Sequence, residues 1–173
     1  MKPVTRDVSI SRRDFLRGNI HAKKRVLRPP WAVKSVLFYE RCTGCADCVD
    51  ACPENILQRD PDGYPAVHFS QAGCTFCAEC LETCETGALQ GLRSDTDQAW
   101  RHTMQISERC LSIGGVVCRA CGDHCEVRAI RFTQLTQGRL LPEINAATCT
   151  GCGQCIAACP ADAITITDKP EIA

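Results

Sequence analysis

The chain has 173 residues, of which 16 are cysteine and only 5% are aromatic, and its 20 basic and 20 acidic side chains cancel. The longest apolar stretch, residues 36–39, is far shorter than the roughly 18 residues that a membrane-spanning helix needs, so we predict no transmembrane segment. Because so few aromatic side chains are available for a core, we expect bound metal to contribute to the folding free energy.

Residues 1–35 are predicted to form a basic N-terminal arm. Ten of the 20 basic residues lie within residues 1–40, where only three residues are acidic, so the rest of the chain is acidic. One basic segment is thin evidence for nucleic-acid binding, and we expect no nucleic-acid partner. We expect the arm to dock on an acidic protein surface through charged and apolar contacts. The candidate partner-binding residues are Arg12, Arg13, Phe15, Leu16 and Trp31.

Within the arm, the sequence SRRDFL at residues 11–16 resembles the twin-arginine export motif. A signal peptide also needs an apolar stretch of about 7–15 residues, whereas here further basic residues follow. Ser11 and Asp14 also fit the capping pattern of a short helix. We therefore do not expect this segment to act as an export signal.

The 16 cysteines fall into four compact runs, and none is left over. Three runs have the spacing C-x2-C-x2-C-x3-C, and run three differs only in a longer first gap. In chain order the runs are Cys42, Cys45, Cys48, Cys52; Cys74, Cys77, Cys80, Cys84; Cys110, Cys118, Cys121, Cys125; and Cys149, Cys152, Cys155, Cys159.

This spacing is typical of bacterial-type ferredoxins, which bind 4Fe–4S clusters. Three thiolates lie on one tight loop, and the fourth reaches a neighbouring cluster from the start of a helix. Structural zinc is the main alternative, but zinc sites usually join two C-x2-C pairs across a longer loop. Disulfides would need an oxidising compartment, and no export signal is evident. The prolines after Cys52 and Cys159 also match the ferredoxin run.

The segments between the runs predict a duplicated α+β fold. Residues 55–58 and 66–69 flank a Pro-Asp-Gly turn and predict a hairpin, and residues 129–132 and 140–144 predict a second one. The fold class is therefore tandem bacterial-type (dicluster) ferredoxin-like modules with a basic N-terminal extension. We expect the arm at residues 1–35, the first module at 36–92, a linker at 93–104 and the second module at 105–173.

The two runs of each module are expected to exchange their fourth cysteines, so that the chain holds four 4Fe–4S clusters. We name the four predicted ligand sets in order. Set one is Cys42, Cys45, Cys48 and Cys84; set two is Cys74, Cys77, Cys80 and Cys52; set three is Cys110, Cys118, Cys121 and Cys159; set four is Cys149, Cys152, Cys155 and Cys125.

Runs two and three depart from the pattern. Glu85 and Glu126 stand where the other runs have proline, and residues 111–117 are inserted after Cys110. We interpret the insertion as a longer loop that still delivers Cys110; the alternative is a labile corner that gives a 3Fe–4S cluster in set three. His124 lies among these ligands, and we expect it to be a solvent-facing or supporting residue.

No motif for covalent haem, nucleotide phosphate or dinucleotide binding is present, and we find no constellation that would transform a substrate. We therefore predict that the protein is not an enzyme and has no catalytic residues.

With the arm included, the chain resembles the NapF family of ferredoxin-type accessory proteins of the periplasmic nitrate reductase system. The resemblance rests on the arm, on residues 28–31, 55–59, 63–65 and 129–132, and on the residues within the cysteine runs. It implies a cytoplasmic protein that binds the catalytic subunit of the nitrate reductase and helps to mature it before export. The alternatives are a general soluble electron carrier and a ferredoxin subunit of a membrane-associated oxidoreductase. The sequence does not identify the redox donor.

Overall fold

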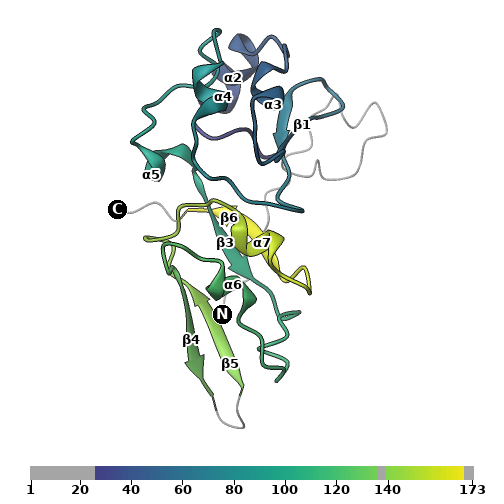
Figure 1. Ribbon diagram of the computed structural model, residues 1–173, viewed down its shortest axis with the longest axis vertical. Coiled ribbons are helices and arrows are strands. Elements are labelled where there is room, and N and C mark those ends of the chain that lie inside the picture. Colours follow the sequence, from purple (N-terminus) through teal and green to yellow (C-terminus); the bar gives the residue numbers. More distant parts are fainter. Residues whose placement is uncertain (1–25, 136–138, 170–173) are drawn as a thin grey trace, which may run out of the picture.

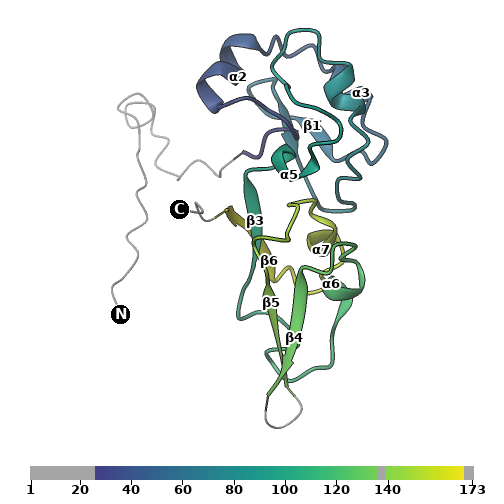
Figure 2. The ribbon, with the colours of Figure 1, turned by 90° about the vertical axis from the view of Figure 1, so that its left-hand side faces the viewer.

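The computed structural model describes residues 26–135 and 139–169. The candidate partner-binding residues Arg12, Arg13, Phe15 and Leu16 lie outside these residues. Both side views place the two cysteine-rich halves one after the other along the long axis, with strands β3 and β6 near the middle (Figures 1 and 2).

The first half is built from short elements around one hairpin. They are α2 (Ser35–Arg41), α3 (Asp47–Asp50), β1 (Leu57–Arg59), β2 (Pro65–Val67) and α4 (Glu79–Glu82). Strands β1 and β2 are antiparallel, with Leu57 opposite Val67. The Asp60 carboxylate accepts hydrogen bonds from the backbone N–H groups of Asp62 and Tyr64, which fixes the turn. The first predicted hairpin is therefore confirmed, with slightly shorter strands.

The second half repeats this plan and adds a second ribbon. Its elements are α5 (Thr96–Ala99), β3 (His102–Ile106), α6 (Ala120–Asp123), β4 (Ile130–Gln134), β5 (Leu140–Ile144), α7 (Gln154–Ala157) and β6 (Ile164–Asp168). Strands β4 and β5 form the second predicted hairpin, with Ile130 opposite Ile144. Strand β3 pairs antiparallel with β6.

The region predicted as a linker, residues 93–104, is more structured than expected. It contains α5 and the start of β3, and Trp100, His102 and Met104 are all buried. Its polar composition suggested a linker, but β3 is stabilised by pairing with β6 at the far end of the chain, which local composition does not reveal. The first half has a smaller counterpart, the bridge between Ala32 and Leu89.

The last part of the predicted arm is also packed into the first half. The backbone N–H of Val67 donates to the carbonyl of Leu27, and Val33 donates to Ala88. Trp31 is only 4% exposed and contacts Phe76 edge-on. Its assignment as a partner-binding anchor is therefore wrong, because an indole buried in the core offers no surface to a partner.

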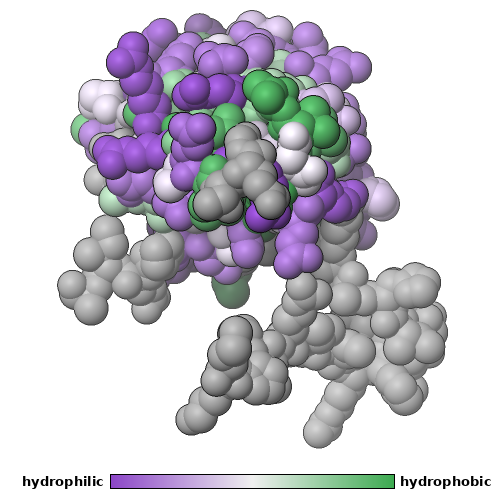
Figure 3. All heavy atoms as spheres, turned by 90° about the horizontal axis from the view of Figure 1, so that it is seen from below, coloured by the Kyte–Doolittle hydropathy of each residue, from purple (hydrophilic) through white to green (hydrophobic). Residues whose placement is uncertain are grey.

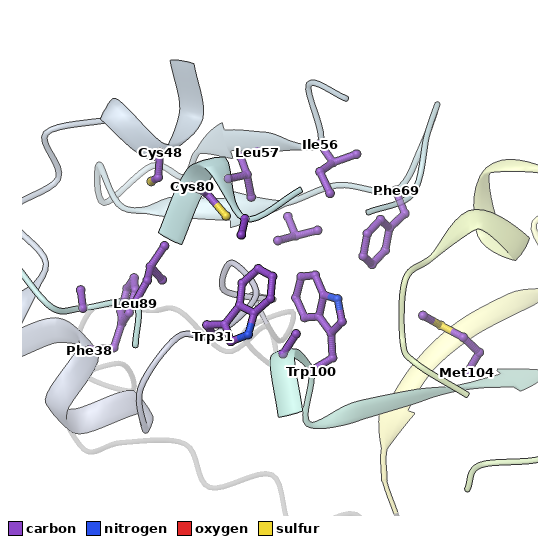
Figure 4. Close-up of a cluster of buried hydrophobic side chains, with 14 of the residues drawn as sticks. Trp31, Phe38, Cys48, Ile56, Leu57, Phe69, Cys80, Leu89, Trp100 and Met104 are labelled. Carbon is purple, nitrogen blue, oxygen red and sulfur yellow. The ribbon is translucent and has the colours of Figure 1, made fainter. Parts of the chain in front are cut away.

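One continuous core joins the two halves. Figure 4 shows Trp31 beside Trp100, with Phe69 next to Trp100 and Met104 farther toward the second half. The buried cysteines Cys48 and Cys80 belong to the same cluster of side chains. Seen from the end of the second half, the described surface is largely hydrophilic, and apolar atoms gather only in small areas (Figure 3).

Candidate metal centres

The third cysteine of each run lies in a one-turn helix and is buried. These cysteines are Cys48 in α3, Cys80 in α4, Cys121 in α6 and Cys155 in α7. Each helix begins two residues after the second cysteine of its run, so the second and third cysteines of a run are separated by a single turn of the chain.

Left-handed backbone shapes these loops. The residue after the second cysteine has positive φ in three runs: Ala46 at 78°, Ala78 at 65° and Gly153 at 82°. This conformation costs an L-residue about 1–2 kcal/mol, so its recurrence at two alanines indicates a turn that the site requires. Run three differs, because Arg119 at the equivalent place has φ of −134°.

Three apolar cavities each contain all four cysteines of one predicted set. The set-two cavity is lined by Cys52, Cys74, Cys77 and Cys80. The set-three cavity is lined by Cys110, Cys118, Cys121 and Cys159. The set-four cavity is lined by Cys125, Cys149, Cys152 and Cys155. In every case three thiols come from one run and one from the other run of the same half, which is the grouping expected from the spacing.

The cysteines of set one are also close together. Burial, followed by the neighbouring thiols of Cys42, Cys45 and Cys84, raises the pKa of Cys48 to about 11. Those three neighbours complete set one. Burial also acts to raise the pKa of Cys84, but hydrogen bonds from Leu89, Thr86 and Ala88 outweigh it, so the pKa of Cys84 lies below its usual value.

The other buried thiols resist ionisation in the metal-free chain. Burial first, and neighbouring cysteines second, raise the pKa values of Cys80 and Cys155 to about 12. Burial is also the largest cause for Cys121, whose pKa rises to about 11. Thiolates are the form that binds metal, so loading these sets must release protons.

Backbone N–H groups point at several of the sulfurs. Ala129 donates to Cys125 Sγ at 3.2 Å, and Ala163 donates to Cys159 Sγ at 3.3 Å, each four residues after the fourth cysteine of its run. Phe76 donates to Cys74 Sγ at 3.4 Å. Such hydrogen bonds stabilise charge on sulfur and tune the potential of a bound iron–sulfur cluster.

The donor sets fit a polynuclear cluster better than a single ion. Within the described residues, no group of three or more His, Cys, Asp or Glu side chains is spaced to hold one metal ion. Tetrahedral zinc needs four sulfurs about 2.3 Å from one centre. Four thiols around an apolar cavity, such as the one also lined by Trp31 and Ile56, instead suit a 4Fe–4S cluster that fills the space between them.

The inserted loop of run three is internally fixed and leaves Cys110 at its cavity. Ser112 is 1% exposed, and its hydroxyl donates to the carbonyl of Cys118 at 2.6 Å. The backbone of Gly114 donates to the carbonyl of Cys110. Glu126 is exposed. His124 is exposed too, and its Nδ1 lies 2.9 Å from the carbonyl of Ala120, next to the set-four cavity.

Sequence reasoning missed two long-range contacts near these cavities, of which the first joins the two halves. The backbone N–H of Cys74 donates to the carbonyl of Cys152 at 2.7 Å, across the boundary between the halves. His102 Nε2 lies 2.9 Å from the carbonyl of Gly151. No local pattern predicts either contact, because each joins segments that are distant in sequence.

Comparison with known proteins agrees with this architecture. The family model for the 4Fe-4S dicluster domain matches residues 41–88 and 116–163. Each match spans the cysteines of one half except one, Cys110, which precedes the second match. The chain is therefore an iron–sulfur protein of the ferredoxin type with two dicluster domains.

The relatives narrow this class to one family. The chain is 40% identical to the ferredoxin-type protein NapF of Haemophilus influenzae, over 94% of this chain and 97% of that protein. It is 38% identical to NapF of Escherichia coli, over 91% and 94%. The methylamine utilization ferredoxin-type protein MauM of Methylophilus methylotrophus is 33% identical over 75% of this chain and 64% of its own length. The chain belongs to the NapF family of ferredoxin-type proteins. In the described part of the chain, no helix is long and apolar enough to cross a membrane.

Proposed function

We propose that this protein binds four 4Fe–4S clusters and acts in the cytoplasm as a maturation and electron-transfer partner of the catalytic subunit of periplasmic nitrate reductase, before that subunit is exported. The observation that carries the proposal is the gathering of the cysteines into the predicted sets of four, in a chain of the NapF family. Bound clusters would supply one-electron redox chemistry.

In this proposal each set holds one cluster, and the protein supplies more than the thiols. Apolar side chains such as Leu57 and Ile106 line the cavities and limit the access of water. The N–H donors of Ala129 and Ala163 hold the sulfurs of Cys125 and Cys159 in place. Set three keeps its alternative of a labile or 3Fe–4S cluster, because Arg119, the residue after Cys118, lacks the left-handed conformation that the other runs have at the equivalent place.

The protein is proposed to be a carrier and accessory factor and not an enzyme. Its cysteines, which are its main chemically reactive side chains, are used by the four sets. The sequence offers no second constellation of nucleophile, base or phosphate-binding loop.

We assign client recognition to the basic arm. The arm precedes an acidic body, so charge complementarity with an acidic surface of the client would favour docking through Arg12 and Arg13, with Phe15 and Leu16 as apolar contacts. Trp31 is removed from this assignment because it is buried. The basic residues that follow the arginine pair, in place of an apolar stretch, support a cytoplasmic location.

Two measurements test the proposal. Anaerobically purified protein should contain about 16 iron and 16 sulfide per chain. A tagged chain, expressed with the nitrate reductase catalytic subunit, should retain that subunit on an affinity resin. Full iron content without retention of the subunit would favour a general electron carrier. Zinc in place of iron, in protein never exposed to air, would contradict the proposed binding of 4Fe–4S clusters and with it the whole proposal.

A further inference from the structure

The two halves meet through the ligand loops of sets two and four. Cys74, the first cysteine of run two, donates its backbone N–H to the carbonyl of Cys152, the second cysteine of run four, at 2.7 Å. The preceding residue, Gly73, is equally close: a Cβ atom there would lie 2.5 Å from the backbone nitrogen of Gln154 and 2.8 Å from the carbonyl oxygen of Cys152. This position therefore admits glycine only.

Two further glycines on the opposite side permit the same close approach. Gly153 has φ of +82°, and any Cβ there would overlap the ring of Phe69 from the first half. Gly151 has φ of +79°, and a Cβ there would lie 3.0 Å from both the Trp100 side chain and the carbonyl of His102. The loop of run four thus fits against Phe69 of the first half at Gly153, and against the segment of Trp100 and His102, which leads out of the first half, at Gly151.

The segment between the halves closes over this contact. Trp31 donates its backbone N–H to the carbonyl of Ala99 at 2.9 Å, and the rings of Phe69 and Trp100 lie 5.9 Å apart, edge to face. Figure 4 shows Trp31, Trp100 and Phe69 side by side in the core. The contact is therefore part of the core, which favours one fixed arrangement of the halves over independent movement.

Within each half, the helices that carry the third cysteines pack together. Helix α3 with Cys48 contacts α4 with Cys80, and α6 with Cys121 contacts α7 with Cys155. Set one is therefore next to set two, and set three is next to set four. Both side views place α7 nearer to the first half than α6 (Figures 1 and 2).

We propose that the junction of Gly73 and Cys74 with Cys152 and Gly153 makes sets two and four direct neighbours, so that the four sets follow one another in space in the order one, two, four, three. This order differs from the order in the chain. It places sets one and three at the two ends, where Cys45 of set one is exposed. The inference rests on the proposed binding of four clusters and adds how this chain arranges them.

A pair of matched variants tests the order. The inner-pair variant retains sets two and four, because the second and third cysteines of runs one and three are replaced by alanine. The outer-pair variant retains sets one and three by the same replacement in runs two and four. The substituted residues are Cys45, Cys48, Cys118 and Cys121 in the inner-pair variant, and Cys77, Cys80, Cys152 and Cys155 in the outer-pair variant.

Each variant should retain about eight iron per chain, and the readout is electron paramagnetic resonance after full reduction. The inner-pair variant should give a spectrum broadened by spin–spin interaction between its clusters. The outer-pair variant should give two non-interacting signals. Interaction in the outer pair, or its absence in an inner pair of full iron content, would overturn the order.

A second test keeps all 16 cysteines and therefore does not depend on the folding of those variants. Gly73→Ala should speed hydrogen–deuterium exchange in peptides from both sides of the junction, residues 70–78 and 149–156, because the added methyl group forces the backbones apart. Gly114→Ala is the matched control: its Cβ would meet the nearest atom, the Leu111 carbonyl oxygen, at an ordinary 3.4 Å. Equal exchange of the junction peptides in the two variants would contradict the contact.

The same preparations separate failure of this inference from failure of the proposed function. A chain without iron after anaerobic reconstitution would defeat the proposed function. About 16 iron in the unsubstituted chain, together with an inner-pair variant that holds about eight iron and shows no spin–spin interaction, would defeat only the proposed order.

Discussion

Arg28 and Asp60 form an ion pair at 2.8 Å that joins the segment before α2 to the tip of the β1–β2 hairpin. The two side chains are only 13% and 6% exposed. Arg28 also donates to the carbonyl of Pro65 at 2.9 Å and to the hydroxyl of Tyr39 at 2.7 Å. The chain is therefore fixed to the first half at Arg28, within the last part of the predicted arm.

Removal of this pair should destabilise the first half. Arg28→Ala leaves the buried Asp60 carboxylate without its partner. We expect the free energy of unfolding to fall by about 3 kcal/mol, which is at the lower end of the range for breaking a buried ion pair. Denaturant unfolding, followed by loss of cluster absorbance under anaerobic conditions, should show a lower midpoint. The matched control is Arg93→Ala, which breaks the exposed pair with Glu82 at 3.3 Å and should cost at most about 1 kcal/mol. Equal midpoints for the two variants would show that the Arg28 pair adds no stability.

Trp31→Ala should lower the stability of the first half and the iron content of set two, and any loss of partner binding should be secondary to these effects. Deletion of a buried tryptophan side chain costs about 3–5 kcal/mol, and Trp31 lines the cavity of set two. We expect slower reconstitution and a loss of iron from set two. Trp31→Phe, which retains most of the apolar volume, should lose less. If Trp31→Ala retained full iron and stability and lost only client binding, the burial of Trp31 would not matter in solution.

The fourth cysteine of each run should serve the cluster of the other run. Cys52→Ser should alter the spectroscopic signal of set two, and Cys84→Ser that of set one, because each of these cysteines lies with three thiols of the other run. The signals of sets one and two can be compared in the two variants by Mössbauer or electron paramagnetic resonance spectroscopy. An altered set-one signal in the Cys52→Ser protein would mean that run one closes its own cluster.

Cys110 should be the ligand of set three that is replaced most easily. Its loop is the longest among the four runs, and Arg119 lacks the left-handed turn that follows the second cysteine elsewhere. Cys110→Ser should give a 3Fe–4S signal in set three, with the other sets unchanged. Cys121→Ser, at a buried position of the same set, should abolish the set-three cluster. Loss of the whole cluster in both variants would show that Cys110 is as necessary as Cys121.

Deletion of residues 1–26 should leave the iron content unchanged and abolish binding of the nitrate reductase catalytic subunit. The described contacts of the first half begin with Leu27, so the deletion removes none of them. Arg12→Ala combined with Arg13→Ala should weaken binding, and added salt should have a similar effect because exposed charges are screened. Full capture of the subunit by the shortened protein in a pull-down would place the interface on the dicluster domains.

The grouping of the cysteines and the two hairpins could be predicted because their signals are local. The spacing of the cysteines places the first three thiols of a run on one short loop. The hydrogen bonds of the Asp60 carboxylate fix the turn of the first hairpin within a few residues. Strand β3 could not be predicted in this way, because His102 and Thr103 resemble linker residues and become buried only when β6 pairs beside them. The junction between Cys74 and Cys152 joins two separate domains, so no periodicity indicates it.

The error at Trp31 has a similar physical origin. A tryptophan after two prolines, at the end of a basic segment, looks exposed when only its neighbours in the chain are considered. Its burial depends on Leu89 and Phe76, which belong to the far side of the same half, and on Gly91, whose lack of a side chain leaves room for the indole. Hydrophobicity alone does not distinguish a core residue from an anchor for a partner.

The pairing of β3 with β6 has a consequence for biosynthesis. All cysteines of sets one and two are synthesised before β3, so the first half can emerge, fold and be loaded while the last part of the chain is still being translated. The second half cannot close until residues 164–168 emerge, because β3 has no partner strand before then. Set three likewise waits for Cys159, close to the C-terminus. A ribosome stalled just short of this point would present a half-loaded protein, with the strand edge of β3 open to aggregation.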